Sequence, residues 1–122
     1  MTPAPHCASR SYGSSCGPVL GGRITKSGSQ NVLDLQFSNG GRLAAGLLVI
    51  GNREIGVPLP GTSCLLLTNP LIPVPFRTDG QGTARWTFRA AQGLSADIRL
   101  QAADLSGTAP LVSNAVQILC LR

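Results

Sequence analysis

The chain has 122 residues, enough for one domain with a single hydrophobic core. Hydrophobic residues make up 43% of it, aromatic residues 4% and charged residues 12%, so aliphatic side chains must fill most of that core. The formal net charge is +5, but the basic residues are scattered, without the basic run and interleaved aromatics of a nucleic-acid-binding protein. No apolar run reaches the length of about 18 residues that a membrane span needs. We therefore expect neither a nucleic-acid partner nor a membrane span.

Short strands separated by turn signals run along the whole sequence. Its 15 glycines and nine prolines are spread out, which is typical of many short elements and not of a disordered tail. In chain order the predicted strands are 19–25, 32–38, 44–52, 64–68, 71–78, 83–90, 96–104 and 111–121. No segment has the pattern of a helix. Seven or eight strands at this spacing predict an all-β fold, a single antiparallel β-sandwich.

Two of these strands have a clear relation to the predicted core. Residues 32–38 alternate, with Leu33, Leu35 and Phe37 on one face and polar residues on the other, as in a half-buried strand. Residues 44–52 are apolar on both faces, which indicates a central strand.

Prolines and a glycine-rich turn characterise the next part of the chain. Residues 71–78 carry Pro73 and Pro75 on the same side, which favours an edge strand because proline cannot donate a backbone hydrogen bond. The sequence DGQG at 79–82 predicts a hairpin turn into the strand at 83–90.

The four cysteines predict disulfides. They contain no C-x-x-C pair, and only His6 could join them in a metal site, so we expect no metal. Four cysteines allow three pairings. Cys7 and Cys120 lie near the two chain ends, whereas Cys16 precedes the first strand and Cys64 opens a central one; we predict the pairs Cys7–Cys120 and Cys16–Cys64. In the loop-entropy model, each bridge contributes up to about 4–5 kcal/mol.

Disulfides also bear on location and domain organisation. They are typical of exported proteins, so we expect an extracellular or cell-surface location. The first residues have no basic or apolar signal region, so an exported protein would have lost its signal peptide from this sequence. We expect residues 1–17 to form a non-strand arm, tethered by the disulfides to a β-sandwich domain at 18–122.

The order of several motifs adds a resemblance. They are YGSSCGP (12–18), a strand pair at 32–52, PLPGTSCLLLTNP (58–70), DGQGTARWTF (79–88) and IRLQAADLSGTAPLVSNAVQI (98–118). In this order they resemble a small secreted β-sandwich module at the C-termini of large extracellular bacterial proteins. The resemblance implies the sandwich fold and a bridge between Cys16 and Cys64, with Cys7 and Cys120 as an addition. It implies no enzymatic activity.

Candidate catalytic and metal-binding residues do not form a convincing site. Ser15 lies at the centre of GSSCG (13–17), but the hydrolase elbow of this pattern needs a strand before the serine and a helix after it. The only histidine, His6, lies in the N-terminal arm. Asp79 suits the DGQG turn better than a calcium site in a chain with five acidic residues. We therefore expect no enzyme and no cofactor.

One possible ligand face remains. Alternation directs Arg85, Thr87 and Arg89 outward from strand 83–90, and Asp97, Arg99 and Gln101 could join them from the following strand. Opposite charges on such a face would stabilise the sheet by a few tenths of a kcal/mol per pair. We favour this structural interpretation of the face. The alternative is contact with an anionic glycan or protein.

Two aromatic residues could bind sugars but have other expected places. Trp86 alternates inward with Ala84 and Phe88, as a core residue would, and Tyr12 lies beside a predicted disulfide and is expected to pack over it. The sequence therefore predicts a non-catalytic structural or adhesive domain of the cell surface, either an accessory module or a subunit of an assembly. Its partners would be copies of itself, other surface proteins or polysaccharide. The alternative function is a carbohydrate-binding module for an anionic or neutral polysaccharide, weakened by the shortage of exposed aromatics.

Overall fold

The structure is a computed structural model that describes residues 6–60, 62–91 and 96–121. These residues are all-β and contain no helix, and therefore no helix that could cross a membrane. The strands are β1 (His6–Tyr12), β2 (Val19–Ser27), β3 (Gln30–Ser38), β4 (Ala45–Gly51), β5 (Glu54–Pro58), β6 (Leu65–Thr68), β7 (Ile72–Arg77), β8 (Ala84–Ala91), β9 (Ala96–Asp104) and β10 (Leu111–Leu121).

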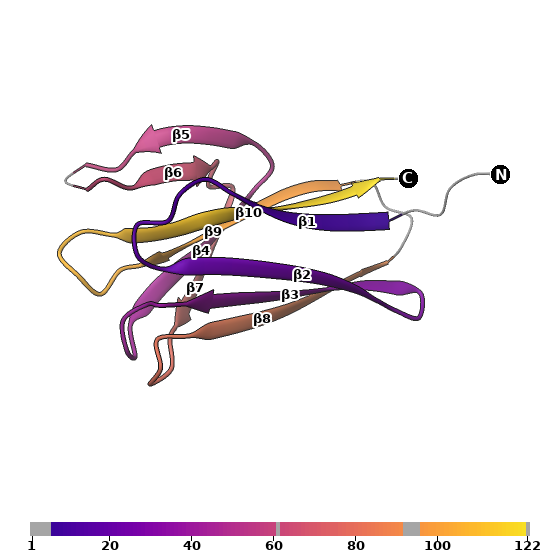
Figure 1. Cartoon of the computed structure of the whole chain (residues 1–122), viewed down its shortest axis with the longest axis horizontal. Coiled ribbons are helices and arrows are strands. Elements are labelled where there is room, and N and C mark those ends of the chain that lie inside the picture. Colours follow the sequence, from indigo (N-terminus) through magenta and orange to yellow (C-terminus); the bar gives the residue numbers. More distant parts are fainter. Residues whose placement is uncertain (1–5, 61, 92–95, 122) are drawn as a thin grey trace.

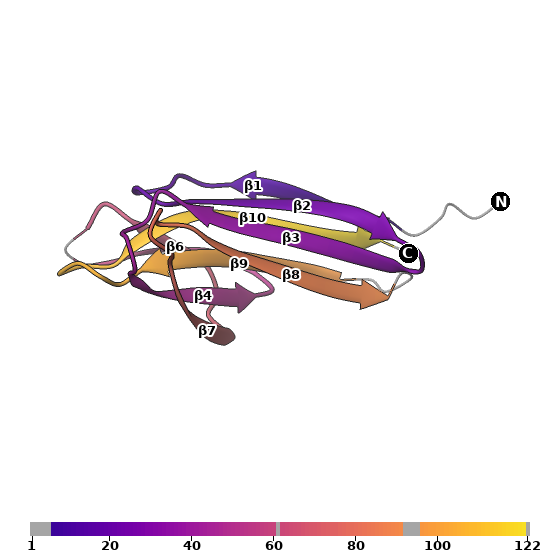
Figure 2. The same cartoon turned by 90° about the horizontal axis from the view of Figure 1, so that it is seen from below.

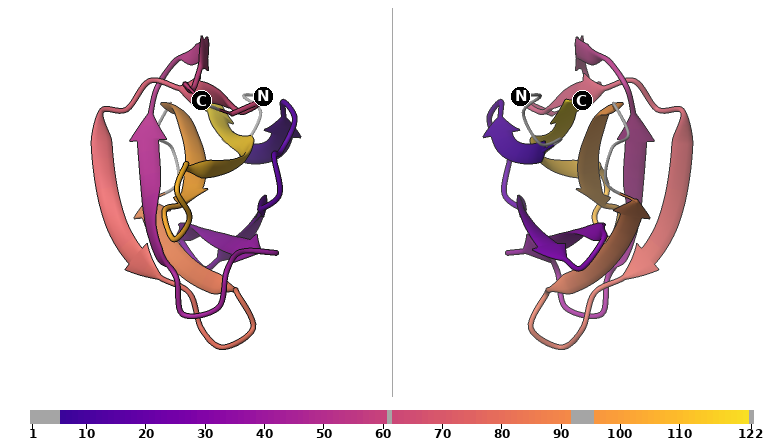
Figure 3. Two further views of the ribbon diagram at one scale, coloured as in Figure 1. Left: turned by 90° about the vertical axis from the view of Figure 1, so that its left-hand side faces the viewer. Right: turned by 90° about the vertical axis from the view of Figure 1, so that its right-hand side faces the viewer.

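The strands form three layers. Sheet A has five strands in the order β1-β10-β9-β4-β7, sheet B has three in the order β2-β3-β8, and β5 pairs with β6 in a separate hairpin that we call hairpin C. All pairings are antiparallel. Sheet A lies between sheet B and hairpin C (Figure 1). Sheet B lies in front of sheet A in the view from below (Figure 2), and the end-on views show the two sheets on opposite sides of the molecule (Figure 3). The predicted antiparallel sandwich is confirmed.

The core fills the space between sheets A and B. The alternation predicted for β3 is confirmed, because Leu35 and Phe37 are fully buried there and Leu33 packs against the same cluster. Phe76 of β7 lies edge-on to both Phe37 and Trp86, with ring centroids 5.2 and 4.9 Å apart. Trp86 is therefore a core residue, as its inward alternation predicted.

The structure has ten strands in its described residues, not seven or eight, and the two additional strands were predicted as an arm and a loop. Residues 6–12 form β1, which pairs along its whole length with β10. Its inner face carries Cys7, Ser9 and Ser11 and its outer face Ala8, Arg10 and Tyr12, so it has no apolar alternation that could reveal it. β5 is short and mostly exposed, with Gly56 and Pro58 weakening its strand pattern.

Connections between neighbouring strands were also misassigned. The turn at 79–82 was expected to close a hairpin, but it links β7 in sheet A to β8 in sheet B. The strand after Cys64 was expected to be central, but it is β6 of hairpin C. The proline-bearing β7 lies at the edge of sheet A, as predicted. A strand pattern indicates which side chains face inward, but it does not specify the sheet to which the strand belongs.

Both predicted disulfides are present. Cys7 and Cys120 occupy directly opposite positions of β1 and β10, so this bridge closes a chain separation of 113 residues across one strand pair. Cys16 and Cys64 are 48 residues apart and join the segment after β1 to the start of β6. Cys64 is buried against Ala103 and Val112, so the second bridge fixes hairpin C to the outer face of sheet A.

Candidate functional site

The predicted ligand face is divided between two sheets. Arg85, Thr87 and Arg89 are exposed and lie on β8 of sheet B, as expected. Arg99 and Gln101 lie on β9, which pairs with β4 and β10 in sheet A and not with β8. The structure therefore does not bring the β8 and β9 residues together into one surface.

Gln101 is a buried structural residue and not a surface residue. The residue is 1% exposed. Its Oε1 accepts a hydrogen bond from the Leu67 N–H at 2.8 Å, while its Nε2 donates to the carbonyl oxygens of Leu65 at 3.0 Å and Ser113 at 2.8 Å. Gln101 does point to the outer face of sheet A, but hairpin C covers it there. Its amide fixes that hairpin to β9 and β10.

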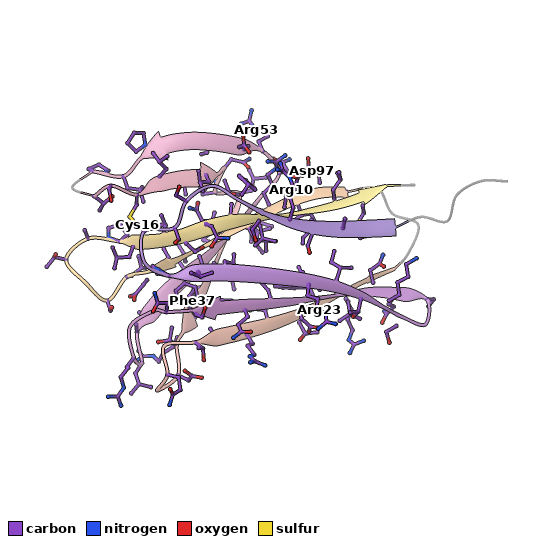
Figure 4. The ribbon with its side chains drawn as sticks, in the orientation of Figure 1. Arg10, Cys16, Arg23, Phe37, Arg53 and Asp97 are labelled. Atoms are coloured by element: carbon purple, nitrogen blue, oxygen red, sulfur yellow. A yellow bond between two sulfur atoms is a disulfide. The ribbon has the colours of Figure 1, made fainter. Side chains whose placement is uncertain are left out.

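Sheet B carries the exposed positive surface. The register places Arg23 of β2 opposite Asp34 of β3, which in turn lies opposite Thr87 of β8. Arg85 and Arg89 flank Thr87 on the same outer face. We call Arg23, Arg85 and Arg89 the arginine face; Figure 4 shows Arg23 on the sheet B side of the molecule. Sequence reasoning missed Arg23 because its strand contains two adjacent glycines and no clear alternation.

A shallow hollow of about 620 Å³ lies across this face, lined by the backbone of Gly21 and Gly22 and by Arg23 and Arg85. A Cβ atom added at Gly21 would meet no atom within 4 Å, so the surface there is open. Asp34 accepts a hydrogen bond from the Thr87 hydroxyl at 3.2 Å. Three guanidinium groups around one carboxylate leave an excess of positive charge on this face.

A second polar group lies on the outer face of sheet A, around Tyr12. The guanidinium carbons of Arg10 and Arg99 lie 5.4 and 5.3 Å from the centroid of its ring. The Tyr12 hydroxyl lies 3.2 Å from the Leu67 carbonyl oxygen and 3.3 Å from Thr68 Oγ1 of β6. The sequence predicted that Tyr12 packs over a disulfide; the contacts found for its ring are these two guanidinium groups.

The charges in this group are paired with one another. Arg99 is 3.3 Å from an Asp97 oxygen and 3.5 Å from a Glu54 oxygen. Gln117 accepts from Arg10 Nε at 2.6 Å and donates to Asp97 at 3.1 Å. Figure 4 shows Arg10 and Asp97 close together below β5. This mutual pairing connects β1, β9, β10 and hairpin C, and leaves little charge for a ligand.

The pairing shifts the pKa values in this group. Burial alone would raise the pKa of Asp97, but hydrogen bonds from Arg99 and Gln117 and the nearby guanidinium charges lower it below its usual value. The contact with Tyr12 is the main cause that raises the pKa of Arg99. Both shifts favour the charged forms, as expected for an ion pair that supports the fold.

The remaining candidate residues have structural positions. Asp79 accepts hydrogen bonds from the backbone of Gln81 and Thr83 and from the Thr83 hydroxyl, and these bonds, with the hydroxyl first, lower its pKa. Ser15 lies between β1 and β2, without the helix that a nucleophile elbow needs. Over the described ranges, His, Cys, Asp and Glu form no group of three that could hold a metal ion.

These features define a class of protein, an all-β antiparallel sandwich with two disulfides and a positively charged outer sheet. No protein-family model, no curated protein and no solved structure matches the chain. The resemblance to a secreted bacterial module therefore rests on the order of its motifs and stays a prediction.

Proposed function

We propose that the protein is a non-catalytic, extracellular adhesive domain that binds anionic polysaccharide through the arginine face of sheet B. The main support for the proposal is that three exposed arginines surround one carboxylate on sheet B, beside an open hollow lined by glycine. Such a domain acts as an accessory module or as a subunit of a larger surface assembly.

The spacing of the arginines supports a polymer as the ligand. Arg23 is level with Thr87 two strands away, so Arg85 and Arg89 each lie about 12 Å from it, while Arg85 and Arg89 are about 13 Å apart along β8. An extended chain with repeated carboxylate or sulfate groups can contact all three, and each additional contact adds to the affinity.

The other contacts of the molecule support anionic over neutral sugars. Neutral polysaccharides are usually bound by stacking on exposed aromatic rings, and Trp86 packs instead against Phe76 in the core. The ring of Tyr12 is already in contact with two guanidinium groups. The extracellular location is supported by the two disulfides, which are uncommon in reducing compartments.

A binding measurement on immobilised polygalacturonate and heparin tests the proposal, with dextran as the neutral control. We expect the Arg85→Ala/Arg89→Ala double variant to bind at least about tenfold more weakly than the parent, and the affinity of the parent to fall as salt rises. The matched control is Arg42→Ala/Arg77→Ala, which removes the same charge from two exposed arginines outside the arginine face. Equal losses in the two double variants would reduce the effect to net charge and contradict the proposal.

A further inference from the structure

A cavity of about 300 Å³ lies between the inner faces of sheets A and B, on the opposite side of sheet B from the arginine face. Its lining residues Cys7 and Cys120 put it at the end of the sandwich where β1 begins and β10 ends, and Figure 1 shows these two strand ends side by side. Its walls are mainly apolar and include Ile50, Ile98 and Ile118 from sheet A and Ile24, Leu33 and Phe88 from sheet B.

The cavity follows from the sequence at the end of sheet A. Cys7, Cys120 and Ala96 stand opposite one another in the register of β1, β10 and β9. All three are small, and the two cysteines are joined to each other, so this row fills little of the space facing sheet B. Phe88 and Ile98 point inward and are nevertheless 38% and 39% exposed, although interior side chains of this size are normally covered. Their exposure indicates unfilled apolar space.

One polar side chain interrupts this apolar lining. Asn31 is on the inner face of β3, in the same row as Leu33 and Leu35, and is only 9% exposed. Its Nδ2 donates to Cys7 Sγ at 3.2 Å, but its Oδ1 has no hydrogen-bond partner among the residues that the structure describes. An unsatisfied buried acceptor costs about 1–3 kcal/mol, and apolar cavities with a few polar groups are typical ligand sites.

From the cavity and the unpaired acceptor we propose that this site binds a neutral hydrocarbon alcohol of about ten non-hydrogen atoms. The size follows from the volume of about 30 Å³ that one small group, such as a water molecule, occupies in a liquid. The hydrocarbon chain fills the space along Phe88 and Ile98, and the hydroxyl donates to Asn31 Oδ1. Arg89 lines the cavity only at its edge and belongs to the outer face of β8, so a charged headgroup could meet it only there, whereas Asn31 is the polar group on the inner face of sheet B.

Calorimetric titration of the whole disulfide-bonded protein with octan-1-ol tests this proposal, and 1-methoxyheptane serves as the matched probe. The ether has a similar size and can accept but not donate a hydrogen bond. We expect saturable binding of the alcohol, about tenfold tighter than that of the ether, since the difference is one hydrogen bond. Absence of saturable alcohol binding, or equal affinities for the two probes, would overturn the proposal.

Two variants locate the binding. Ala96→Phe fills the cavity and should abolish binding, whereas Ala45→Phe, at an exposed position of β4 outside the cavity, should leave it unchanged. Asn31→Leu keeps a side chain of similar size in the wall but removes the hydrogen-bond acceptor, so the alcohol and the ether should then bind equally. This second variant decides the outcome if Ala96→Phe does not fold. A tenfold preference for the alcohol that persists in Asn31→Leu would exclude this site.

Discussion

Asn114 completes the backbone hydrogen bonds of Leu20 as a neighbouring strand would. Its Oδ1 accepts from the Leu20 N–H at 3.0 Å, and its Nδ2 donates to the Leu20 carbonyl at 2.8 Å. The two residues belong to β10 in sheet A and β2 in sheet B, at a point where the register between β10 and β9 shifts between Val112 and Ala115. The irregularity frees this side chain to join the two sheets at one edge.

Replacing Asn114 with alanine is therefore expected to destabilise the fold strongly. The change leaves both backbone groups of the fully buried Leu20 without their partner and opens a small cavity. We expect the free energy of unfolding to fall by about 2–4 kcal/mol. Urea denaturation measures this change. The control is Asn39→Gly, which removes an exposed hydrogen bond to the Gly17 carbonyl, keeps a residue suited to the positive φ of 62° at this position, and should cost less than about 1 kcal/mol. Similar losses in the two variants would contradict the role given to Asn114.

The alternation of residues along a strand predicted the direction of side chains well, but it could not predict which outward side chains another part of the chain covers. Phe37 points into the core and Arg85 points to solvent, as expected, because both follow from the two-residue period of one strand. Gln101 also points outward from its sheet, but hairpin C buries it. The cover exists because β5 pairs with β6, and the sequence pattern did not predict that pairing.

Strand partners were the larger gap in the sequence prediction. β8 and β9 are consecutive and were expected to share a face, yet they belong to different sheets. Arg99 therefore lies on sheet A and not on sheet B with the arginine face. Arg23 joined that face only through its register with Asp34. The disulfides could be chosen from the three possible pairings because chain ends often lie close together in a domain, which favours Cys7 with Cys120 and leaves Cys16 for Cys64. Sheet membership depends on contacts between distant residues, which a single sequence does not record.

Gln101 gives a prediction that separates structural from binding roles. Gln101→Leu removes the partners of the Leu65 and Ser113 carbonyls and of the Leu67 N–H, so we expect a loss of about 2–4 kcal/mol in the free energy of unfolding. Polygalacturonate binding, measured well below the unfolding temperature, should be unchanged. A loss of binding in a variant that remains folded would return Gln101 to the ligand face.

The two disulfides should stabilise different parts of the molecule. β1 is an edge strand held by β10, and Cys7→Ala/Cys120→Ala removes its covalent link, so amide hydrogen exchange should accelerate mainly across residues 7–12. Cys16→Ala/Cys64→Ala should accelerate exchange in β5 and β6 instead. Each change should lower the free energy of unfolding by up to about 5 kcal/mol in the loop-entropy model. Uniform acceleration over the whole chain in both variants would contradict this division.

Asp104 should make stability depend on pH. Its Oδ2 accepts from the Gly41 N–H at 2.7 Å, and its Oδ1 accepts from the Ser106 N–H at 2.9 Å and the Ser106 hydroxyl at 2.6 Å. Burial alone would raise the pKa of Asp104, but these hydrogen bonds lower it overall. A carboxyl whose pKa is lower in the folded than in the unfolded protein contributes stability above the unfolded value, near pH 4. That contribution is lost as the pH falls through the lower, folded value.

The Asp104→Asn variant measures this contribution directly, because the amide does not titrate. At pH 7 we expect the variant to be about 1–3 kcal/mol less stable, since its Nδ2 cannot accept the hydrogen bonds that a carboxylate oxygen accepts. The difference from the parent protein should shrink below about pH 4, as the carboxyl of the parent protein becomes protonated. Asp34→Asn, on the exposed face of β3 with a single hydrogen bond from Thr87, is the matched control and should change stability little at any pH. Denaturation curves at pH 7, 5, 4 and 3 provide the comparison, and a difference for Asp104→Asn that stays constant over this range would show that the carboxylate charge is not what stabilises the turn.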